Sequence, residues 1–231
     1  MIQKKNKYEP KKNWTKLFNK VNNISYPAEG VIRIFKGKFP KLKLKFKKNQ
    51  KILDLGFGDG RHILFLKNLG LNVFGTEISS DIVEKAKKNF KSLSKNFNIG
   101  TSDKINFKSN YFDILLSWNS CYYMNPKDPF NFKQHVEEMN RVLKTNGLLI
   151  LSIPKKSSFI YKNSKKIKNG YRVIKDDYFK VRDGQIMRCF ENKLEIENNF
   201  KKNFRNFIHS SIDINWFGLD YHWHILIAKK K

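Results

Sequence analysis

The sequence is poor in cysteine and in long apolar runs. Its 231 residues include two cysteines, Cys121 and Cys189, which could form at most one disulfide and match no zinc spacing. This usage predicts a reducing, cytoplasmic location and no metal site. No stretch approaches the roughly 20 apolar residues of a membrane helix, and no apolar run follows the basic N-terminus. We therefore expect neither a membrane partner nor a secretory signal.

Arginine is scarce as well, although the chain is strongly basic. Only seven of the 47 basic side chains are arginine, and the formal net charge is +27. A nucleic-acid partner would explain such a charge, because cationic side chains neutralise phosphates. The excess is lysine spread along the whole chain, however, whereas arginine is the better bidentate reader of phosphate and guanine. The charge therefore favours a lysine-rich solvated surface over a nucleic-acid site.

The length and a hydrophobic content of 40% are typical of one α/β domain with elaborations. Residues 1–49 are predicted to form a basic tail and a helical extension, with short amphipathic helices at Trp14–Phe18 and Ala28–Phe35. Residues 50–231 are expected to form the main domain, in which strands and helices alternate up to residue 153 and the last third changes character. Such alternation indicates parallel strands joined by right-handed crossovers.

The expected elements follow from apolar runs, helical periodicity and caps. The expected strands are Lys51–Leu55, Asn72–Thr76, Phe97–Gly100, Tyr111–Ser117, Leu148–Ile153, Asn203–Ile214 and Tyr221–Ala228. The expected helices are Arg61–Leu69, Asp81–Phe90, Phe130–Leu143 and Glu191–Lys202. A hairpin is expected over Val181–Ile186, because it centres on Asp-Gly.

The most informative segment is a glycine-rich loop, Asp54-Leu55-Gly56-Phe57-Gly58-Asp59-Gly60-Arg61, between the first strand and the first helix of this alternation. Glycines there allow a sharp turn and a close approach to a ligand. Arg61 takes the place of the third glycine of a dinucleotide fingerprint. Asp54 would repel a pyrophosphate and attract a cationic amino group, and Glu77 ends the second strand, where an acid can accept both ribose hydroxyls. The loop therefore predicts a nucleoside cofactor without phosphates.

At these residues the chain resembles the class I SAM-dependent methyltransferases of the small-molecule type. The resemblance covers residues 50–153 and is carried by segments 52–60 (ILDLGFGDG), 75–79 (GTEIS), 111–117 (YFDILLS) and 146–150 (NGLLI). It implies a Rossmann-like α/β fold with a seven-stranded, mostly parallel sheet, helices on both faces and an antiparallel last strand. It also implies S-adenosylmethionine (SAM) as the cofactor.

The resemblance implies that Asp54, Gly56 and Gly58 hold the methionine end of SAM. It implies that Glu77 binds the ribose and that Ile78 packs on adenine. The Ser117 carbonyl would accept a hydrogen bond from the amino group of SAM. Many relatives carry Gly-Asp after the third strand, with that Asp reading the adenine amino group. This sequence has Gly-Thr-Ser-Asp at residues 100–103 instead. Either Thr101 replaces the acid, or Asp103 supplies it from a shifted loop.

The acceptor site is expected beyond the carboxyl ends of the fourth and fifth strands. Residues 118–124 (WNSCYYM) lie there and combine aromatic side chains with polar groups, as small-molecule sites do. Tyr122, Tyr123 and His135 are candidate acceptor contacts or bases. The alternative is that they are core or surface aromatics, and His135 could be a solvated helix residue. Cys121 follows Ser120 rather than a proline, which argues against the covalent catalysis of cytosine C5 enzymes.

Two further features leave alternatives open. His222 and His224 share one face of the last expected strand and could meet His209 around a metal. No compact third and fourth ligand accompanies them, so packing or acceptor contact is favoured. Residues 154–190 are basic and aromatic, which predicts a substrate lid or cap, with an RNA-contact surface as the rival interpretation.

Taken together, these features predict a cytoplasmic enzyme that transfers a methyl group from SAM to a small-molecule acceptor by in-line displacement. One alternative is a methyltransferase of RNA or another nucleic acid, motivated by the net charge. The other is a catalytically inactive SAM-binding partner subunit. It is motivated by the displaced adenine-loop acid and by the absence of an unambiguous base.

Overall fold

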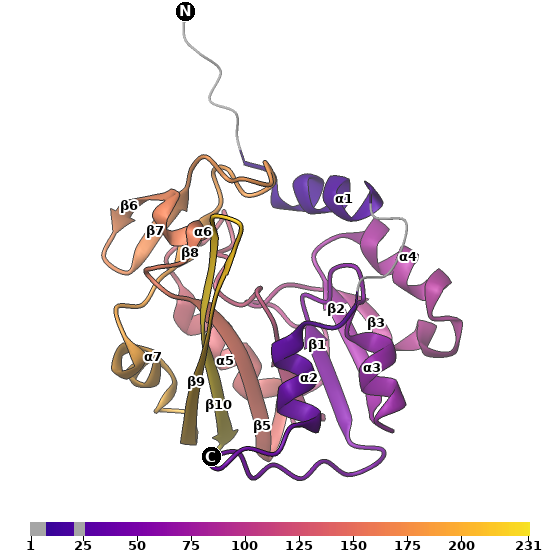
Figure 1. Ribbon diagram of the computed structural model, residues 1–231. Coiled ribbons are helices and arrows are strands. Elements are labelled where there is room, and N and C mark those ends of the chain that lie inside the picture. Colours follow the sequence, from indigo (N-terminus) through magenta and orange to yellow (C-terminus); the bar gives the residue numbers. More distant parts are fainter. Residues whose placement is uncertain (1–7, 21–25) are drawn as a thin grey trace, which may run out of the picture.

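A computed structural model describes residues 8–20 and 26–231 of the chain and shows a large and a small β-sheet (Figure 1). The large sheet has seven strands in the order β3-β2-β1-β4-β5-β10-β9. Their bounds are β1 Lys51–Leu55, β2 Asn72–Glu77, β3 Phe97–Ile99, β4 Phe112–Ser117, β5 Leu143–Pro154, β9 Phe204–Trp216 and β10 Leu219–Lys230. Strands β1 to β5 pair in parallel, whereas β10 pairs antiparallel with both β5 and β9. The predicted Rossmann-like sheet is therefore confirmed.

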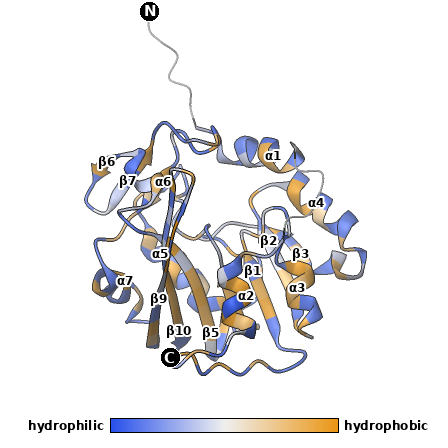
Figure 2. Cartoon of the chain, viewed as in Figure 1, coloured by the Kyte–Doolittle hydropathy of each residue, from blue (hydrophilic) through white to orange (hydrophobic). Residues whose placement is uncertain are grey.

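The central strands carry continuous apolar runs because both faces of the sheet are covered. Ile52 on β1 aligns with Val73 on β2 and Ile114 on β4, and all three side chains are buried. Apolar residues accordingly dominate β5 and the other central strands (Figure 2). Such a run is what the sequence shows at each central strand, which is why these strands were predictable.

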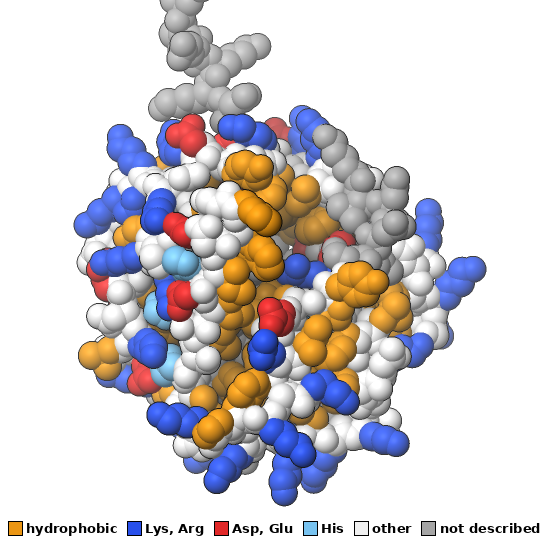
Figure 3. Space-filling view, in the orientation of Figure 1, with side chains coloured by type: hydrophobic (Ala, Val, Ile, Leu, Met, Phe, Trp, Pro, Cys, Tyr) orange, Lys and Arg blue, Asp and Glu red, His pale blue; other side chains and the backbone are white. Residues whose placement is uncertain are grey.

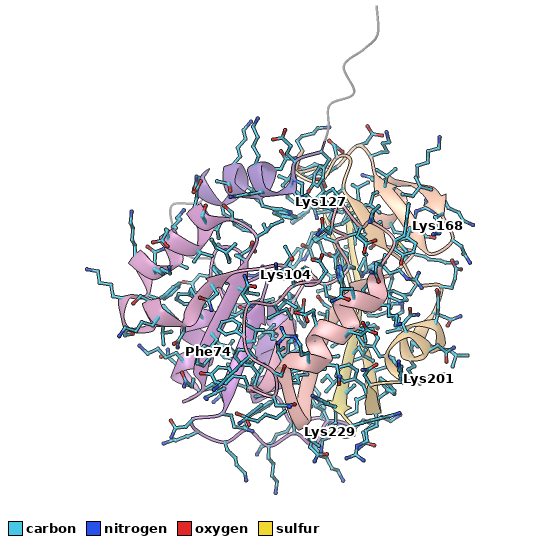
Figure 4. The ribbon with its side chains drawn as sticks, turned by 180° about the vertical axis from the view of Figure 1, so that it is seen from behind. Phe74, Lys104, Lys127, Lys168, Lys201 and Lys229 are labelled. Atoms are coloured by element: carbon cyan, nitrogen blue, oxygen red, sulfur yellow. The ribbon has the colours of Figure 1, made fainter. Side chains whose placement is uncertain are left out.

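Helices lie on both faces of the sheet, as expected. Helix α2 (Glu29–Lys36) lies in front of the sheet in Figure 1, whereas α5 (Phe132–Val142) covers it from behind, as Figure 4 shows. Helices α3 (Ile63–Asn68) and α4 (Ser80–Asn89) contact β2, and α7 (Lys193–Phe200) packs against α5 and β9. A short 3-10 helix spans Lys91–Asn96. Among the described residues, none of the helices is long and apolar enough to pass through a bilayer.

The boundaries of α5 and β5 differ from the expectation. Helix α5 begins at Phe132 rather than at Phe130, because the side chain of Asn131 caps it by accepting a hydrogen bond from the Gln134 backbone N–H. Strand β5 begins at Leu143, five residues earlier than expected. Leu143 is buried and aligns with Phe112 of β4, so the chain enters the sheet directly from the helix.

Residues 155–190 form a small subdomain beside the carboxyl ends of the sheet, which we call the cap. It contains α6 (Phe159–Lys162) and a three-stranded antiparallel sheet of β6 (Ser164–Lys168), β7 (Tyr171–Ile174) and β8 (Ile186–Arg188). The prediction of a tight hairpin over Val181–Ile186 is wrong. Gly184 does turn the chain, with φ +87°, but β8 pairs with β7 across the long connection 175–185.

The cap is joined to the segment that follows β4. The Arg188 backbone N–H donates to the Tyr122 carbonyl at 2.9 Å, and the Met124 N–H donates to the Ile186 carbonyl at 2.9 Å. The Gln185 side chain adds a bond to the Met124 carbonyl at 2.8 Å. Residues 122–124 thereby lie along the edge of the small sheet, so hydrogen bonds tie the cap to the expected acceptor segment.

Candidate functional site

The glycine loop turns directly after β1 at three residues with positive φ. Gly56, Gly58 and Gly60 have φ of +74°, +59° and +80°, a region that favours glycine. A Cβ on Gly56 would lie 2.6 Å from the Cβ of Ser120, and one on Gly58 would lie 2.7 Å from the Cζ of Phe18. Glycine is therefore required both by the turn and by the approach of two other segments. At Gly58 the approaching group is a helix side chain of this chain.

Two buried carboxylates flank the loop. Asp54 lies near the end of β1 with its Oδ2 3.3 Å from His62 Nδ1. Glu77 ends β2, and its oxygens accept from the backbone N–H groups of Gly58 at 3.2 Å and Ile78 at 2.6 Å. Burial raises the pKa of Glu77 to about 7, against these two hydrogen bonds, and the charge of Asp54 adds to the rise. Additional hydrogen-bond donors at Glu77 would therefore stabilise its ionised form.

The two candidates for the adenine-contacting residue lie on one turn but differ in their surroundings. Thr101 and Lys104 close the turn through two backbone hydrogen bonds of 3.1 Å, and the Gly100 N–H donates to the Glu77 carbonyl. Asp103 instead accepts from the Asn125 side chain at 2.8 Å and lines an open surface cavity of about 510 Å³ on the α5 side. Burial opposes its ionisation, but the hydrogen bonds from the Asn125 and Thr101 side chains, together with the charge of His135, outweigh burial and lower the pKa of Asp103.

Serine hydroxyls hold the segment after β4 in place. Ser117 Oγ lies 2.7 Å from Ser120 Oγ, which donates to the Leu55 carbonyl at 2.6 Å. Asn119 has a positive φ of +59°, and its backbone N–H donates to Ser152 Oγ on β5 at 2.7 Å. Ser117 thus lies beside the glycine loop, as expected. Ser120 was not singled out from the sequence, because a serine in a loop carries no signal of which backbone it will contact.

Tyr122 and Tyr123 follow this segment and lie together, with ring centroids 4.5 Å apart. Tyr122 is fully buried, and its hydroxyl has no hydrogen-bond partner of acceptable geometry among the described residues. Burial raises the pKa of Tyr122 well above its usual value, and Tyr123 and Tyr221 raise it further, against the opposing effect of Arg182. Tyr122 therefore stays protonated at neutral pH and can donate a hydrogen bond.

His135 and Cys121 lie in the core. His135 is 1% exposed, so its interpretation as a solvated helix residue is wrong. Its Nδ1 lies 3.0 Å from the Cys121 carbonyl, so Nδ1 carries the proton, and burial lowers the pKa of the ring. Burial also raises the pKa of the Cys121 thiol to about 12. A protonated, buried thiol is a poor nucleophile.

Helix α1 (Pro10–Lys20) crosses above the loop ends of the sheet and reaches the cap (Figure 1). Phe18 lies against Gly58, and Thr15 Oγ1 lies 2.5 Å from Ser79 Oγ after β2. At the other end, Trp14 lies 5.6 Å from Tyr123, ring to ring, and the Asn13 side chain donates to a cap carbonyl, that of Val181, at 3.2 Å. The helix therefore bridges the two halves of the site, a role that a short amphipathic pattern could not reveal.

A hollow lies on the face shown in Figure 3, below α1 and between the tips of β9 and β10 and the loop ends of β1 and β2. Apolar side chains border it, and both basic and acidic side chains are visible inside. Lysines are instead scattered over the rest of the surface. The labelled lysines in Figure 4 lie far apart on the back of the molecule: Lys104, Lys127, Lys168, Lys201 and Lys229.

The histidines of the last strands have separate partners. His209 Nε2 lies 2.6 Å from Glu197, whereas His222 Nδ1 lies 2.9 Å from Ser157 Oγ. Burial lowers the pKa of His224 to about 4, helped by nearby lysines. Within residues 8–20 and 26–231, no group of three or more His, Cys, Asp and Glu is placed to hold a metal ion.

Known proteins that resemble this chain are mostly described as methyltransferases. A family model described as a methyltransferase domain matches residues 53–151. An uncharacterized protein of Methanocaldococcus jannaschii is 25% identical over 76% of this chain and 71% of its own length. The ubiquinone biosynthesis O-methyltransferase of Pelagibacter ubique is 28% identical over 58% of this chain, which spans 53% of that enzyme. A SAM-dependent methyltransferase structure from Methanosarcina mazei shares the fold, with a TM-score of 0.59, 20% identity and coverage of 80% and 94%.

Proposed function

Since this chain is a class I SAM-dependent methyltransferase, we propose that it methylates a small-molecule acceptor held between the glycine loop, α1 and the cap. The observation that carries the proposal is the bridge made by α1. The helix contacts Gly58 and Ser79 at one end and Tyr123 and Val181 at the other. An acceptor bound beneath such a bridge must be small. The name of the Pelagibacter ubique relative, which acts in ubiquinone biosynthesis, agrees with a small-molecule acceptor.

The residues present suit SAM chemically. The methionine end would lie beside Asp54, whose carboxylate attracts the amino group, and along the turn at Gly56 and Gly58, which Ser120 and Phe18 border. Glu77, buried and with a pKa of about 7, gains hydroxyl donors from the ribose. Ile78 packs on adenine, and the Ser117 carbonyl accepts from the amino group. Of the two adenine-loop candidates we favour Thr101, because Asp103 is engaged with Asn125 on the α5 side.

When bound, SAM supplies a methyl group made electrophilic by a positively charged sulfur. Held beside Asp54 and Glu77, SAM would donate this methyl group to a lone pair of the acceptor. The chain's own contribution is to align the acceptor in line with the carbon–sulfur bond and to exclude water. Tyr123 and Trp14 form the wall that aligns the acceptor, and the α1 bridge limits the entry of water.

The three candidate catalytic residues receive different roles. Tyr122 remains protonated, so it acts as a hydrogen-bond donor to the acceptor rather than as a base. Tyr123 lies between Tyr122 and Trp14 and contacts the acceptor. His135 is a positioning residue, because it acts through the Cys121 carbonyl that it holds.

The test is incubation of the protein with methyl-labelled SAM and a host extract separated into small molecules, RNA and protein. We expect label in the small-molecule fraction. The matched variant Glu77→Ala should lose this labelling, because the loss of charged hydrogen bonds weakens SAM binding by about 1–3 kcal/mol.

Two outcomes would contradict the proposal. Label in the RNA fraction that depends on Glu77 would establish the nucleic-acid alternative, which the net charge of +27 motivates. Calorimetric binding of SAM without labelled product in any fraction would establish the inactive partner subunit.

A further inference from the structure

The acceptor side of the site contains a buried arginine that the roles above do not use. Arg182 is 9% exposed, and Asp177 binds one edge of its guanidinium, with Nε to Oδ2 at 3.2 Å and Nη2 to Oδ1 at 3.0 Å. The guanidinium also lies over the rings of Phe159 and Phe179, 5.3 and 5.1 Å from their centroids. These contacts hold the guanidinium in one orientation before a ligand arrives.

Asp177 does not exhaust the binding capacity of the arginine. Its Oδ2 also accepts from the backbone N–H groups of Val181 and Arg182, each at 3.0 Å, so its negative charge is shared. An arginine has five N–H donors, so Arg182, which also hydrogen-bonds to the Tyr123 side chain, can still bind a further acceptor. Burial alone would lower the pKa of Arg182, but Tyr123, Asp177 and Tyr122 outweigh burial and raise it. Both tyrosines are therefore neighbours of the guanidinium.

Buried hydrogen-bond donors without partners lie around the same arginine. The indole N–H of Trp223, which is only 3% exposed, has no acceptor in the part of the chain that the structure describes, and the Tyr122 hydroxyl makes no hydrogen bond of good geometry there, although it lies near the Tyr123 side chain. Trp223 stacks on Tyr221 at 4.3 Å and lies 5.9 Å from Phe159. Buried donors that lack acceptors are unfavourable. A molecule that brings acceptor oxygens would satisfy them.

We propose that this group, the Arg182 cluster of Tyr122, Tyr123, Phe159, Arg182, Tyr221 and Trp223, binds the carboxylate of a small planar acid that is the methyl acceptor. A carboxylate matches the planar fork of a guanidinium. The stacked rings of Tyr221 and Trp223 suit a planar skeleton. Asp177 opposes a second negative charge, which favours a carboxylate over a phosphate.

The carboxylate is the group by which the acceptor is held, and the methyl group goes to another atom of the same molecule. The site holds the acceptor only if the chain methylates a small molecule, as proposed above. Arg61, at the end of the glycine loop, lowers the pKa of Tyr221 together with Arg182, although burial outweighs both. Two positive charges therefore lie near Tyr221, which suits an anionic acceptor.

The experiment measures binding rather than turnover. A panel of planar carboxylic acids and their primary amides is screened by saturation-transfer NMR in the presence of S-adenosylhomocysteine, and dissociation constants are measured for the hits. We expect at least one acid to bind about tenfold or more tightly than its amide, because charged hydrogen bonds are the stronger ones. Arg182→Gln should remove this preference. The control Arg172→Gln should keep it, because Arg172 binds Ser164 elsewhere in the cap.

If no acid binds more tightly than its amide, or if Arg182→Gln keeps the preference, the inference is wrong. Should Arg182→Gln not fold, Tyr122→Phe removes one donor at nearly constant shape and should reduce the preference several-fold; an unchanged preference would also overturn the inference. Binding of S-adenosylhomocysteine separates the two proposals. If S-adenosylhomocysteine binds but no acid is preferred, only the inference about the Arg182 cluster is wrong. If S-adenosylhomocysteine does not bind, the proposed function itself is wrong.

Discussion

At one end of the site two buried carboxylates, Asp54 and Glu77, border a glycine loop, whereas at the other a buried guanidinium, that of Arg182, lies among tyrosines. The first end suits a cationic nucleoside, and the second suits an anionic acceptor. Opposite charges attract strongly where water is excluded. The comparison suggests that charge, besides shape, decides which ligand enters which end and in which orientation.

The largest effect is expected from filling the glycine loop at the acidic end. Gly56→Ala should abolish detectable SAM binding by calorimetry, a loss of about 100-fold or more, because its Cβ would meet Ser120 at 2.6 Å. Gly218→Ala is the matched control, since Gly218 also has a positive φ but has nothing within 4 Å of the added Cβ. If both variants bind SAM equally, the loop is not the cofactor site.

A smaller effect is expected from the titration of Glu77. Its raised pKa, about 7, means that the folded protein without ligand holds more protons than the unfolded chain between pH 4.5 and 7, so that Glu77 lowers the stability as pH rises through this window. Ribose hydroxyls prefer the ionised carboxylate. We therefore expect SAM affinity to rise about tenfold from pH 6 to pH 8.

Glu77→Gln should remove this pH dependence, and Glu84→Gln, at an exposed carboxylate on α4, should preserve it. Isothermal titration at both pH values measures the difference. A parent protein whose affinity does not change with pH would show that Glu77 does not contact the cofactor.

The smallest effect is expected from the α1 bridge between the two ends. Phe18→Ala removes the ring that lies on Gly58, so S-adenosylhomocysteine should dissociate about threefold to tenfold faster in a stopped-flow experiment. Lys16→Ala, on the exposed side of the same helix, should leave the rate unchanged. Equal rates in the two variants would show that α1 does not retain the ligand.

The geometry of the proposed cofactor half was predictable because its signals are local. The turn at Gly56 and Gly58 follows an apolar strand directly, and Glu77 ends the next strand, which is parallel and adjacent, so the chain itself brings these residues together. Asp103 shows where prediction from local signals fails. Its place depends on Asn125, which comes from a different loop.

The geometry of the proposed acceptor half was only partly predictable because its contacts join distant segments. Tyr122 and Tyr123 were found as candidates from their place after β4, but Arg182 and the α1 residues Trp14 and Phe18 were not. His135 was placed on the correct helix with its surroundings left open, since a helical pattern alone does not show that its Nδ1 binds the Cys121 carbonyl in the core.

The sequence by itself determined the seven-stranded sheet, the glycine loop and its two acids, because apolar periodicity and strand-end positions are properties of neighbouring residues. Only the tertiary structure decided what closes the site: α1 over Gly58, the cap paired with residues 122–124, and Arg182 beside the tyrosines. These contacts join residues that lie tens of positions apart in the chain. Chain folding sets their distances, and no local pattern records them.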